Sequence, residues 1–142
     1  ISKPFHLELE TTILLSHHRI SPKIVYHSKS TEKYKYFVME KLDLTLYHLL
    51  KFKLITPSHI SKLKKLLERL NKTPYRHNDL HLNNIMWSDS IGDFRLIDWG
   101  SYWKTTYLSN TQSPTLITRI NTYMNKTYYH YMCCGYNFSY WK

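Results

Sequence analysis

Residues 76–86 read RHNDLHLNNIM, and residues 94–100 read FRLIDWG. The first stretch carries a carboxylate, Asp79, and, after four intervening residues, an amide, Asn84. The second stretch is a short apolar run that leads into Asp98. A polar turn, SDSIGD, lies between the runs IMW and FRLI, so the pattern predicts a hairpin of two short strands. Such a hairpin would bring Asp79, Asn84 and Asp98 to one end.

These side chains have the chemistry that phosphoryl transfer from a nucleotide requires. That reaction needs a carboxylate near the accepting hydroxyl and oxygen ligands that hold Mg²⁺ against the phosphates. The pattern therefore predicts a base and two metal ligands among Asp79, Asn84 and Asp98. Asp and Asn are common in turns, so each residue alone would mean little. The combination at these intervals is what indicates a site.

The motifs HNDLHLNN and IDWG together resemble the catalytic loop and the metal-binding DFG turn of the protein-kinase-like superfamily. The resemblance implies a structural role for His77, the catalytic base at Asp79, and metal ligands at Asn84 and Asp98. His81 stands where serine/threonine kinases usually carry lysine, which implies that it is a catalytic residue beside the transferring phosphate. The loop is most similar to those of divergent kinases of large DNA viruses. Histidine here is also typical of small-molecule kinases of the aminoglycoside and choline type.

Upstream residues extend the resemblance to about residues 7–100. Glu10 is similar in position to the helix glutamate that pairs with the nucleotide-contacting lysine. The run YFVMEKL is similar to the strand that enters the hinge, which implies that Met39 is the gatekeeper and that Glu40 and Leu42 lie against the adenine ring. The resemblance thus implies ATP and Mg²⁺ as cofactors, and a protein or small-molecule hydroxyl as the acceptor.

Local patterns predict an α+β fold. The expected elements are a short helix over 5–15, strands over 23–27 and 34–39, helices over 42–52 and from Thr56 to Leu70, the hairpin, and a helix after Ser113-Pro114. In terms of the resemblance, residues 1–41 are a partial small lobe of one helix and two strands, and residues 42–142 are a shortened, mainly helical large lobe. A glycine-rich phosphate loop and a strand lysine do not precede Glu10, so we expect a truncated domain, either a fragment or a natural minimal form.

Composition sets the wider bounds. A chain of 142 residues with 42% hydrophobic content, 3 Gly and 5 Pro predicts one packed domain. The net charge of +10 suits acidic partners such as nucleotide phosphates. The adjacent Cys133 and Cys134 do not form an ordinary disulfide. With no signal peptide and no apolar run of membrane-spanning length, the sequence predicts an intracellular, cytoplasmic protein without membrane contact. Nothing in it indicates an oligomeric state.

Several functions stay open from the sequence alone. The first is an ATP-dependent phosphotransferase, with a serine/threonine protein kinase as its leading form and a small-molecule kinase as the alternative. The second is a catalytically inactive pseudokinase that binds a partner. A metal site of hydrolase type at His77, Asp79 and His81 is a further hypothesis, and it leaves IDWG unexplained. Nucleic-acid binding through the charge and the 13 tyrosines is the competing class, although no nucleic-acid-binding module is visible.

Overall fold

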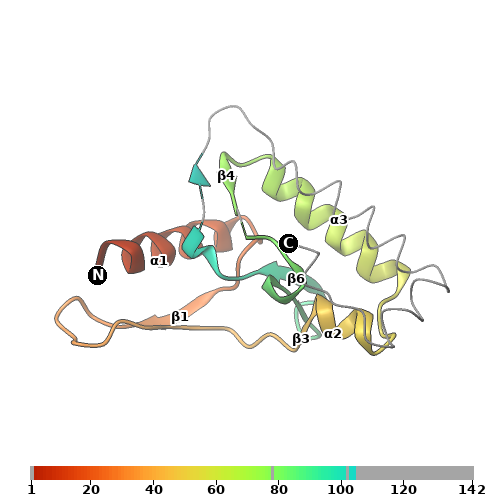
Figure 1. Cartoon of the computed structure of the whole chain (residues 1–142), viewed down its shortest axis with the longest axis horizontal. Helices are drawn as coiled ribbons and strands as arrows, with labels where there is room; N and C mark the ends of the chain where they lie inside the picture. Colours follow the sequence, from red (N-terminus) through yellow and green to blue (C-terminus); the bar gives the residue numbers. More distant parts are fainter. Residues whose placement is uncertain (1, 78, 102, 105–142) are drawn as a thin grey trace.

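The computed structural model describes residues 2–77, 79–101 and 103–104 (Figure 1). Its N-terminal part is one helix, α1 (Ser2–His17), and an antiparallel pair of strands, β1 (Ile24–His27) and β2 (Phe37–Met39). The sequence predicts one helix and two strands here, and the second strand begins three residues later than expected. The helix expected after Ser113 and the cysteine pair lie outside the described residues.

The turn after α1 is held by several hydrogen bonds. Arg19 takes a left-handed backbone conformation with φ of +57°. The amide of Ile20 then donates to the carbonyl of Leu15 at 3.0 Å. The hydroxyl of Ser21 donates to the carbonyl of Thr12. These bonds satisfy carbonyls at the end of the helix and direct the chain into β1.

The second helix, α2 (Leu46–Lys51), is shorter than the predicted helix over 42–52. The prediction was wrong at its start, because Leu44–Thr45 forms a strand, β3, that pairs with residues 86 and 87. The side chain of Thr45 then caps α2 and accepts a hydrogen bond from the amide of His48 at 3.1 Å. Pairing with distant residues therefore decides this boundary rather than local helical spacing.

The longest described helix after α1 is α3 (Pro57–Asn71), close to the predicted range. Thr56 and His59 form a capping box: the amide of His59 donates to Thr56 Oγ1 at 3.3 Å, and the amide of Thr56 donates to His59 Nδ1 at 3.0 Å. The predicted apolar stripe is buried, and its members are Ile60, Leu63, Leu66, Leu67 and Leu70.

The predicted hairpin is confirmed as β5 (Ile85–Ser88) and β6 (Asp93–Leu96). Gly92 lies in its turn with φ of +70°, a conformation that favours glycine. The register pairs Ile85 with Leu96 and Ser88 with Asp93, and β3 adds to the other edge of β5. This register sets which polar residues meet at the open end of the hairpin.

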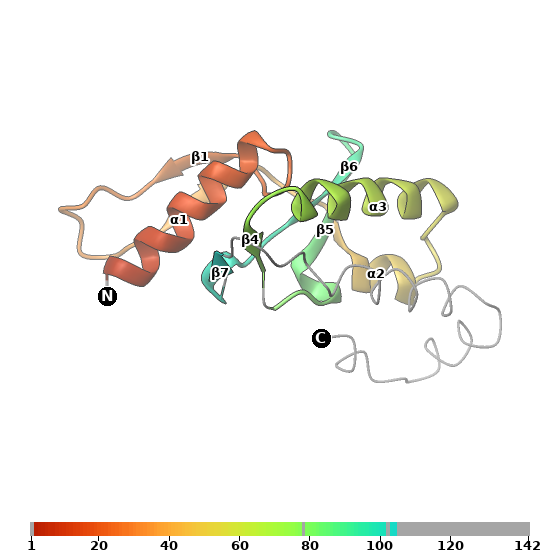
Figure 2. The ribbon, with the colours of Figure 1, turned by 90° about the horizontal axis from the view of Figure 1, so that it is seen from above.

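Short elements surround that open end. Strand β4 (Tyr75–Arg76) pairs with β7 (Trp103–Lys104), and two 3-10 turns, η1 (Leu82–Asn84) and η2 (Trp99–Ser101), flank the hairpin. Trp99 and Phe94 are the largest fully buried side chains, and both belong to the core formed with α2 and α3. Figure 2 shows α1 and β1 at one end of the molecule and α2, α3 and β5 at the other. None of the described helices combines the length and apolarity needed to cross a bilayer.

Candidate active site

His77 fastens the Asp79 loop to the turn after β6. Its side chain is fully buried, and its Nε2 lies 2.7 Å from the carbonyl oxygen of Ile97. Its Nδ1 accepts a hydrogen bond from the amide of Asp79 at 3.2 Å. The neutral ring therefore carries its proton on Nε2 and donates it to Ile97. The structural role expected for His77, a buried histidine bonded to backbone groups, is confirmed.

Burial also determines the charge state of His77. It lowers the pKa of the imidazole below its ordinary value, and this effect outweighs the opposing hydrogen bond to Ile97 and the charges of Asp98 and Asp79. The ring also packs against the indole of Trp99, with the ring centres 4.5 Å apart. His77 is thus a neutral imidazole that links the Asp79 loop to the turn after β6 through hydrogen bonds.

Asn84 holds the other side of the loop. Its side chain is buried, and its Nδ2 donates to the carbonyl of Asp79 at 2.9 Å. The backbone carbonyl of Asn84 accepts from the amide of Ile97 at 2.9 Å, which extends the β5–β6 pairing by one step. No described residue donates a hydrogen bond to Asn84 Oδ1. Asp79, Asn84 and Ile97 are therefore fixed to one another through the backbone.

His81 lies between the side chains of Asp79 and Asn84. Its Nε2 is 3.7 Å from Asp79 Oδ2 and 3.0 Å from Asn84 Nδ2. Its Nδ1 is 3.2 Å from the amide of Asn83. A neutral imidazole has one acceptor nitrogen, so it accepts from Asn83 or from Asn84 but not from both. When Asn83 is the donor, the ring proton lies on Nε2 and faces the carboxylate of Asp79.

The side chain of Asp79 is about one-third exposed, at 36%, so its carboxylate is open to a substrate. Asp98 is also exposed and lies two residues after the end of β6. Its backbone is left-handed with φ of +62°, which costs a residue other than glycine about 1–2 kcal/mol. The neighbouring Trp99 stabilises this conformation, because its buried side chain donates from Nε1 to the carbonyl of Leu96 at 3.1 Å.

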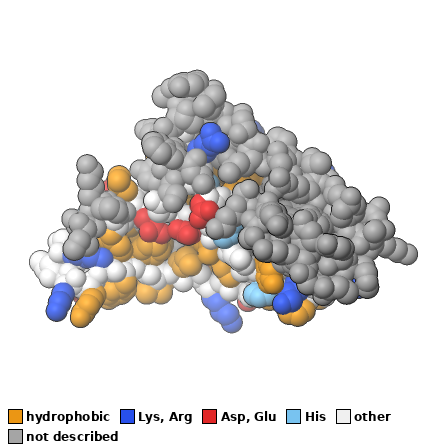
Figure 3. Space-filling model, viewed as in Figure 1, with side chains coloured by type: hydrophobic (Ala, Val, Ile, Leu, Met, Phe, Trp, Pro, Cys, Tyr) orange, Lys and Arg blue, Asp and Glu red, His pale blue; other side chains and the backbone are white. Residues whose placement is uncertain are grey.

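Glu8 on α1 is a residue of the site that sequence reasoning missed. A Cβ placed on Gly100 would lie 3.6 Å from Glu8 Oε1 and 3.6 Å from Asp98 Oδ1. Burial, and secondarily the charge of Asp98, raises the pKa of Glu8 above its ordinary value. Figure 3 shows acidic side chains close together over the region where α1 meets η2.

The structure places the predicted Glu10 away from this pair. Glu10 is exposed on α1, and two positions of a helix lie about 200° apart around its axis. Glu8 instead shares a face with the buried Thr12 and Leu15. The spacing of these residues is the signal that could have identified Glu8 from the sequence.

The predicted gatekeeper Met39 ends β2, and the predicted adenine contacts Glu40 and Leu42 lie in the connection from β2 to β3. Met39 pairs with Ile24 at the end of β2, and the amide of Glu40 donates to the carbonyl of Lys23 at 2.9 Å. Met39, Glu40 and Leu42 are each partly exposed. Their contact with a nucleotide base stays a prediction.

The donor atoms at the open end of the hairpin suit magnesium. Asn84 Oδ1 and the Asp98 carboxylate are oxygen donors, and Mg²⁺ is usually held by one or two protein oxygens together with phosphates and water. Within the described ranges, no group of three or more His, Cys, Asp or Glu side chains could hold a metal ion by itself. Both ring nitrogens of His77 are bonded to backbone groups, so His77 has no nitrogen free for the hydrolase-type site with Asp79 and His81. A magnesium site that shares its ligands with a nucleotide does not involve His77.

Comparisons with known proteins identify the fold. No family model matches the sequence. No curated protein matches it either. The solved structures that are similar to it include two kinases, each with a TM-score of 0.56. The kinase PK-1 of the Cydia pomonella granulovirus is 18% identical, with 75% of this chain and 43% of that chain covered. The yeast RNA polymerase II CTD kinase complex CTDK-1 is 23% identical, with 70% and 34% covered.

These similarities confirm the predicted α+β, protein-kinase-like fold with a partial small lobe of one helix and two strands. At identities below one quarter they show the fold alone. This chain spans between 34% and 43% of the length of those two chains.

Proposed function

We propose that this chain carries the base and the metal ligands of an ATP-dependent phosphotransferase, which transfers the γ-phosphoryl group of ATP to a hydroxyl. One observation carries the proposal: His77 and Asn84 bond the Asp79 loop directly to the segment that ends in Asp98. A fixed spacing between a base and a metal ligand is what in-line phosphoryl transfer requires, because positioning and electrostatics supply most of its catalysis.

Each residue has a role in this mechanism. Asp79, which is partly exposed, accepts a hydrogen bond from the acceptor hydroxyl, orients the hydroxyl toward the phosphorus and takes its proton. Asn84 Oδ1 and the Asp98 carboxylate would hold Mg²⁺. When bound, Mg²⁺ supplies positive charge that offsets the charge developing on the phosphate oxygens. The rigid hydrogen bonds of His77 and Asn84 keep these groups in place between turnovers.

His81 completes the site as a hydrogen-bond donor. With its ring proton on Nε2, it lies beside the carboxylate of Asp79 and can donate to an oxygen of the transferring phosphate. A protein hydroxyl is the acceptor that we favour, because the yeast relative is a kinase of the RNA polymerase II CTD. A small-molecule hydroxyl is the alternative that His81 itself supports. The granulovirus relative is in keeping with a viral kinase.

The second candidate function is that of an inactive pseudokinase, and it rests on Glu8. Its carboxylate faces Asp98, and in the part of the chain that the structure describes no cation offsets either charge. A domain in this state could bind a nucleotide or a partner without transferring phosphate. Both candidates keep the same fold, so a measurement of phosphate transfer distinguishes them.

Thermal denaturation of the 142-residue chain with and without ATP and MgCl₂ tests the first candidate. We expect a metal-dependent rise in melting temperature that Asp98→Asn abolishes and that Glu10→Gln, the matched loss of an exposed carboxylate, leaves intact. Asp79→Asn should keep the rise but lose transfer of γ-phosphate from labelled ATP to a hydroxyl substrate. A rise without any transfer in the unmodified chain would favour the second candidate. No response to ATP at all would contradict the proposed nucleotide site.

A further inference from the structure

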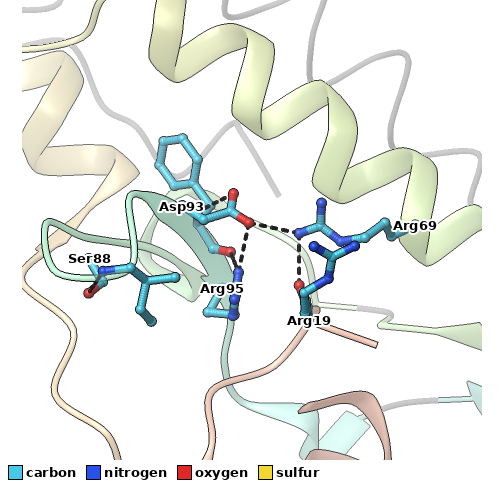
Figure 4. Close-up of polar contacts among 7 residues, drawn as sticks. Arg19, Arg69, Ser88, Asp93 and Arg95 are labelled. Atoms are coloured by element: carbon cyan, nitrogen blue, oxygen red, sulfur yellow. Dashed lines mark hydrogen bonds and ion pairs between the residues drawn. The ribbon is translucent and has the colours of Figure 1, made fainter. Parts of the chain in front are cut away.

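Two arginines, Arg69 and Arg95, bond one carboxylate beside the end of α1, and Arg19 lies next to Arg69 (Figure 4). Asp93, at the start of β6, accepts from Arg69 Nη2 at 3.0 Å and from Arg95 Nη1 at 2.9 Å, both on its Oδ2. The carbonyl oxygen of Arg19 accepts from Arg69 Nη2 at 2.8 Å. Arg69 therefore joins α3 both to β6 and to the turn after α1.

The charges of this arginine cluster, defined as Arg19, Arg69, Arg95 and Asp93, do not balance. The cluster holds three guanidinium groups and a single carboxylate, which pairs with only Arg69 and Arg95 and whose second oxygen already accepts from the amide of Phe94 at 2.8 Å. Asp93 attracts Arg69, whereas Arg95 and Arg19 repel it. Arg95 is buried at 7% exposure, so solvent screens this excess charge poorly.

Donors in the cluster are also left without acceptors. Arg69 Nε is buried and has no hydrogen-bond partner. The Arg19 side chain is exposed, and its guanidinium donates to none of the described residues. Figure 4 shows the Arg19 side chain extending alongside that of Arg69. An unpaired buried N–H is costly, and two adjacent guanidinium groups without an anion between them repel each other.

We propose that Arg19 and Arg69 bind one phosphate-sized oxyanion, either inorganic phosphate or a phosphate monoester. The planar guanidinium fork matches the oxygens of phosphate in two parallel hydrogen bonds. Arg19 is at the surface and can move aside to admit the anion to Arg69 Nε, while Arg95 adds favourable charge from within. The anion would tie the turn after α1 to α3, and α1 carries Glu8.

Variants at Arg19 test the site without removing the bonds that Arg69 makes to Asp93. Arg19→Asn removes the guanidinium, and asparagine tolerates a left-handed backbone. Lys53→Asn is a matched control, because Lys53 is an exposed cation with φ of +58° at the end of α2. Arg19→Lys keeps the charge but loses the fork. Unchanged circular dichroism and melting temperature without phosphate would show that each variant folds.

Isothermal titration calorimetry with inorganic phosphate, at constant ionic strength set by chloride, gives the readout. We expect saturable binding at one site, weakened about tenfold or more by Arg19→Asn, less by Arg19→Lys, and less than about twofold by Lys53→Asn. Titration with O-phosphoserine distinguishes the two sources: tighter binding than inorganic phosphate indicates a phosphorylated side chain, and equal or weaker binding indicates the free ion.

Three results would overturn the proposal. The first is absence of saturable phosphate binding. The second is an equal loss in Arg19→Asn and Lys53→Asn, which would indicate general charge attraction. The third is binding that requires an oligonucleotide and strengthens with its length, since that would make the arginines part of a nucleic-acid surface.

Discussion

Glu8 and Asp98 face each other across Gly100, where α1 meets the turn that follows β6. They come from elements about ninety positions apart in the sequence, and both are acidic. Burial and the nearby charge of Asp98 raise the pKa of Glu8. Ionisation of Glu8 therefore destabilises the junction between α1 and the turn that follows β6.

Replacing Glu8 by Gln should stabilise the chain at neutral pH. The pKa of Glu8 is higher in the folded state than in the unfolded state. Stability is therefore lost as the pH rises above about 4.5, because the unfolded chain ionises first. Glu8→Gln removes this loss. We expect a gain of less than about 1 kcal/mol in the free energy of unfolding at pH 7, since solvent screens a partly exposed charge.

Urea denaturation of Glu8→Gln and Glu10→Gln at pH 7.0 and pH 5.0 separates the two positions on α1. Glu10→Gln is the control, since Glu10 is exposed on the opposite side of the helix. The advantage of Glu8→Gln over the unmodified chain should shrink toward pH 5. Equal effects of both substitutions would contradict the pairing of Glu8 with Asp98.

The choice between Glu8 and Glu10 illustrates where sequence reasoning stops. Residues 5–15 contain apolar side chains on more than one side of the helix, so the buried face is set by what α1 packs against. That partner is the turn at Trp99 and Gly100, which is remote in sequence. The resemblance assigned the glutamate by the number of residues that separate it from the next strand. That count cannot distinguish two glutamates that lie half a helical turn apart.

Elements with strong local signals were predicted well. Helix α3 has a capping threonine, a proline and a regular apolar stripe, and the β5–β6 hairpin has a polar turn with glycine. Strands β3 and β4 were missed because each has two residues and exists only through pairing, with Met86 and Trp87 for β3 and with β7 for β4. The position of Asn84 beside Ile97, which precedes Asp98, was predictable from the hairpin register, whereas Asp79 is held by hydrogen bonds to His77 and Asn84.

Trp99 should contribute more to stability than its position in a turn suggests. It is fully buried, donates from Nε1 to the Leu96 carbonyl at 3.1 Å, and packs against His77. Trp99→Phe removes a hydrogen bond, leaves the Leu96 carbonyl without its partner and opens a small cavity. We expect a loss of about 2 kcal/mol in the free energy of unfolding, measured by urea denaturation.

Trp87→Phe is the matched control for Trp99→Phe. Trp87 is partly exposed, and its Nε1 bonds to the exposed Asp89 at 2.8 Å. Water can replace that bond, so the loss should be below about 1 kcal/mol. If Trp87→Phe lost as much free energy of unfolding as Trp99→Phe, the contacts of Trp99 with His77 and Leu96 would contribute no more to stability than those of a partly exposed tryptophan.

Stability should fall in mild acid because of His77. Burial lowers the pKa of His77 in the folded chain, whereas the unfolded histidine titrates near about 6.5. The unfolded chain therefore takes up the proton first, and the free energy of unfolding should decrease below about pH 6.5 by up to about 1.4 kcal/mol per pH unit. Above that pH the contribution of His77 is constant.

His59 also has a lowered pKa, mainly through burial, so its contribution must be removed. His59→Gln does so and keeps the capping box, since glutamine serves at this position. Urea denaturation of His59→Gln between pH 7.5 and pH 5.5 should retain a downward slope. NMR titration should find the His77 ring neutral well below pH 6.5. A ring that titrates at or above that value would contradict its burial.

Asp93→Asn should destabilise the chain although Asp93 lies outside the proposed active site. Its carboxylate accepts from Arg69 and Arg95, and its side chain is 17% exposed. Without it, the two guanidinium groups repel each other in a poorly hydrated place, so we expect a loss of about 2–3 kcal/mol in the free energy of unfolding. Asp89→Asn is the control, because exposed Asp89 also accepts a hydrogen bond but faces no arginine among the described residues.

Equal losses in 0.05 M and 1 M NaCl are expected for Asp93→Asn, since salt screens a buried pair only weakly. A loss that disappears in 1 M NaCl would indicate that the cluster is hydrated and that Asp93 contributes only as a surface charge.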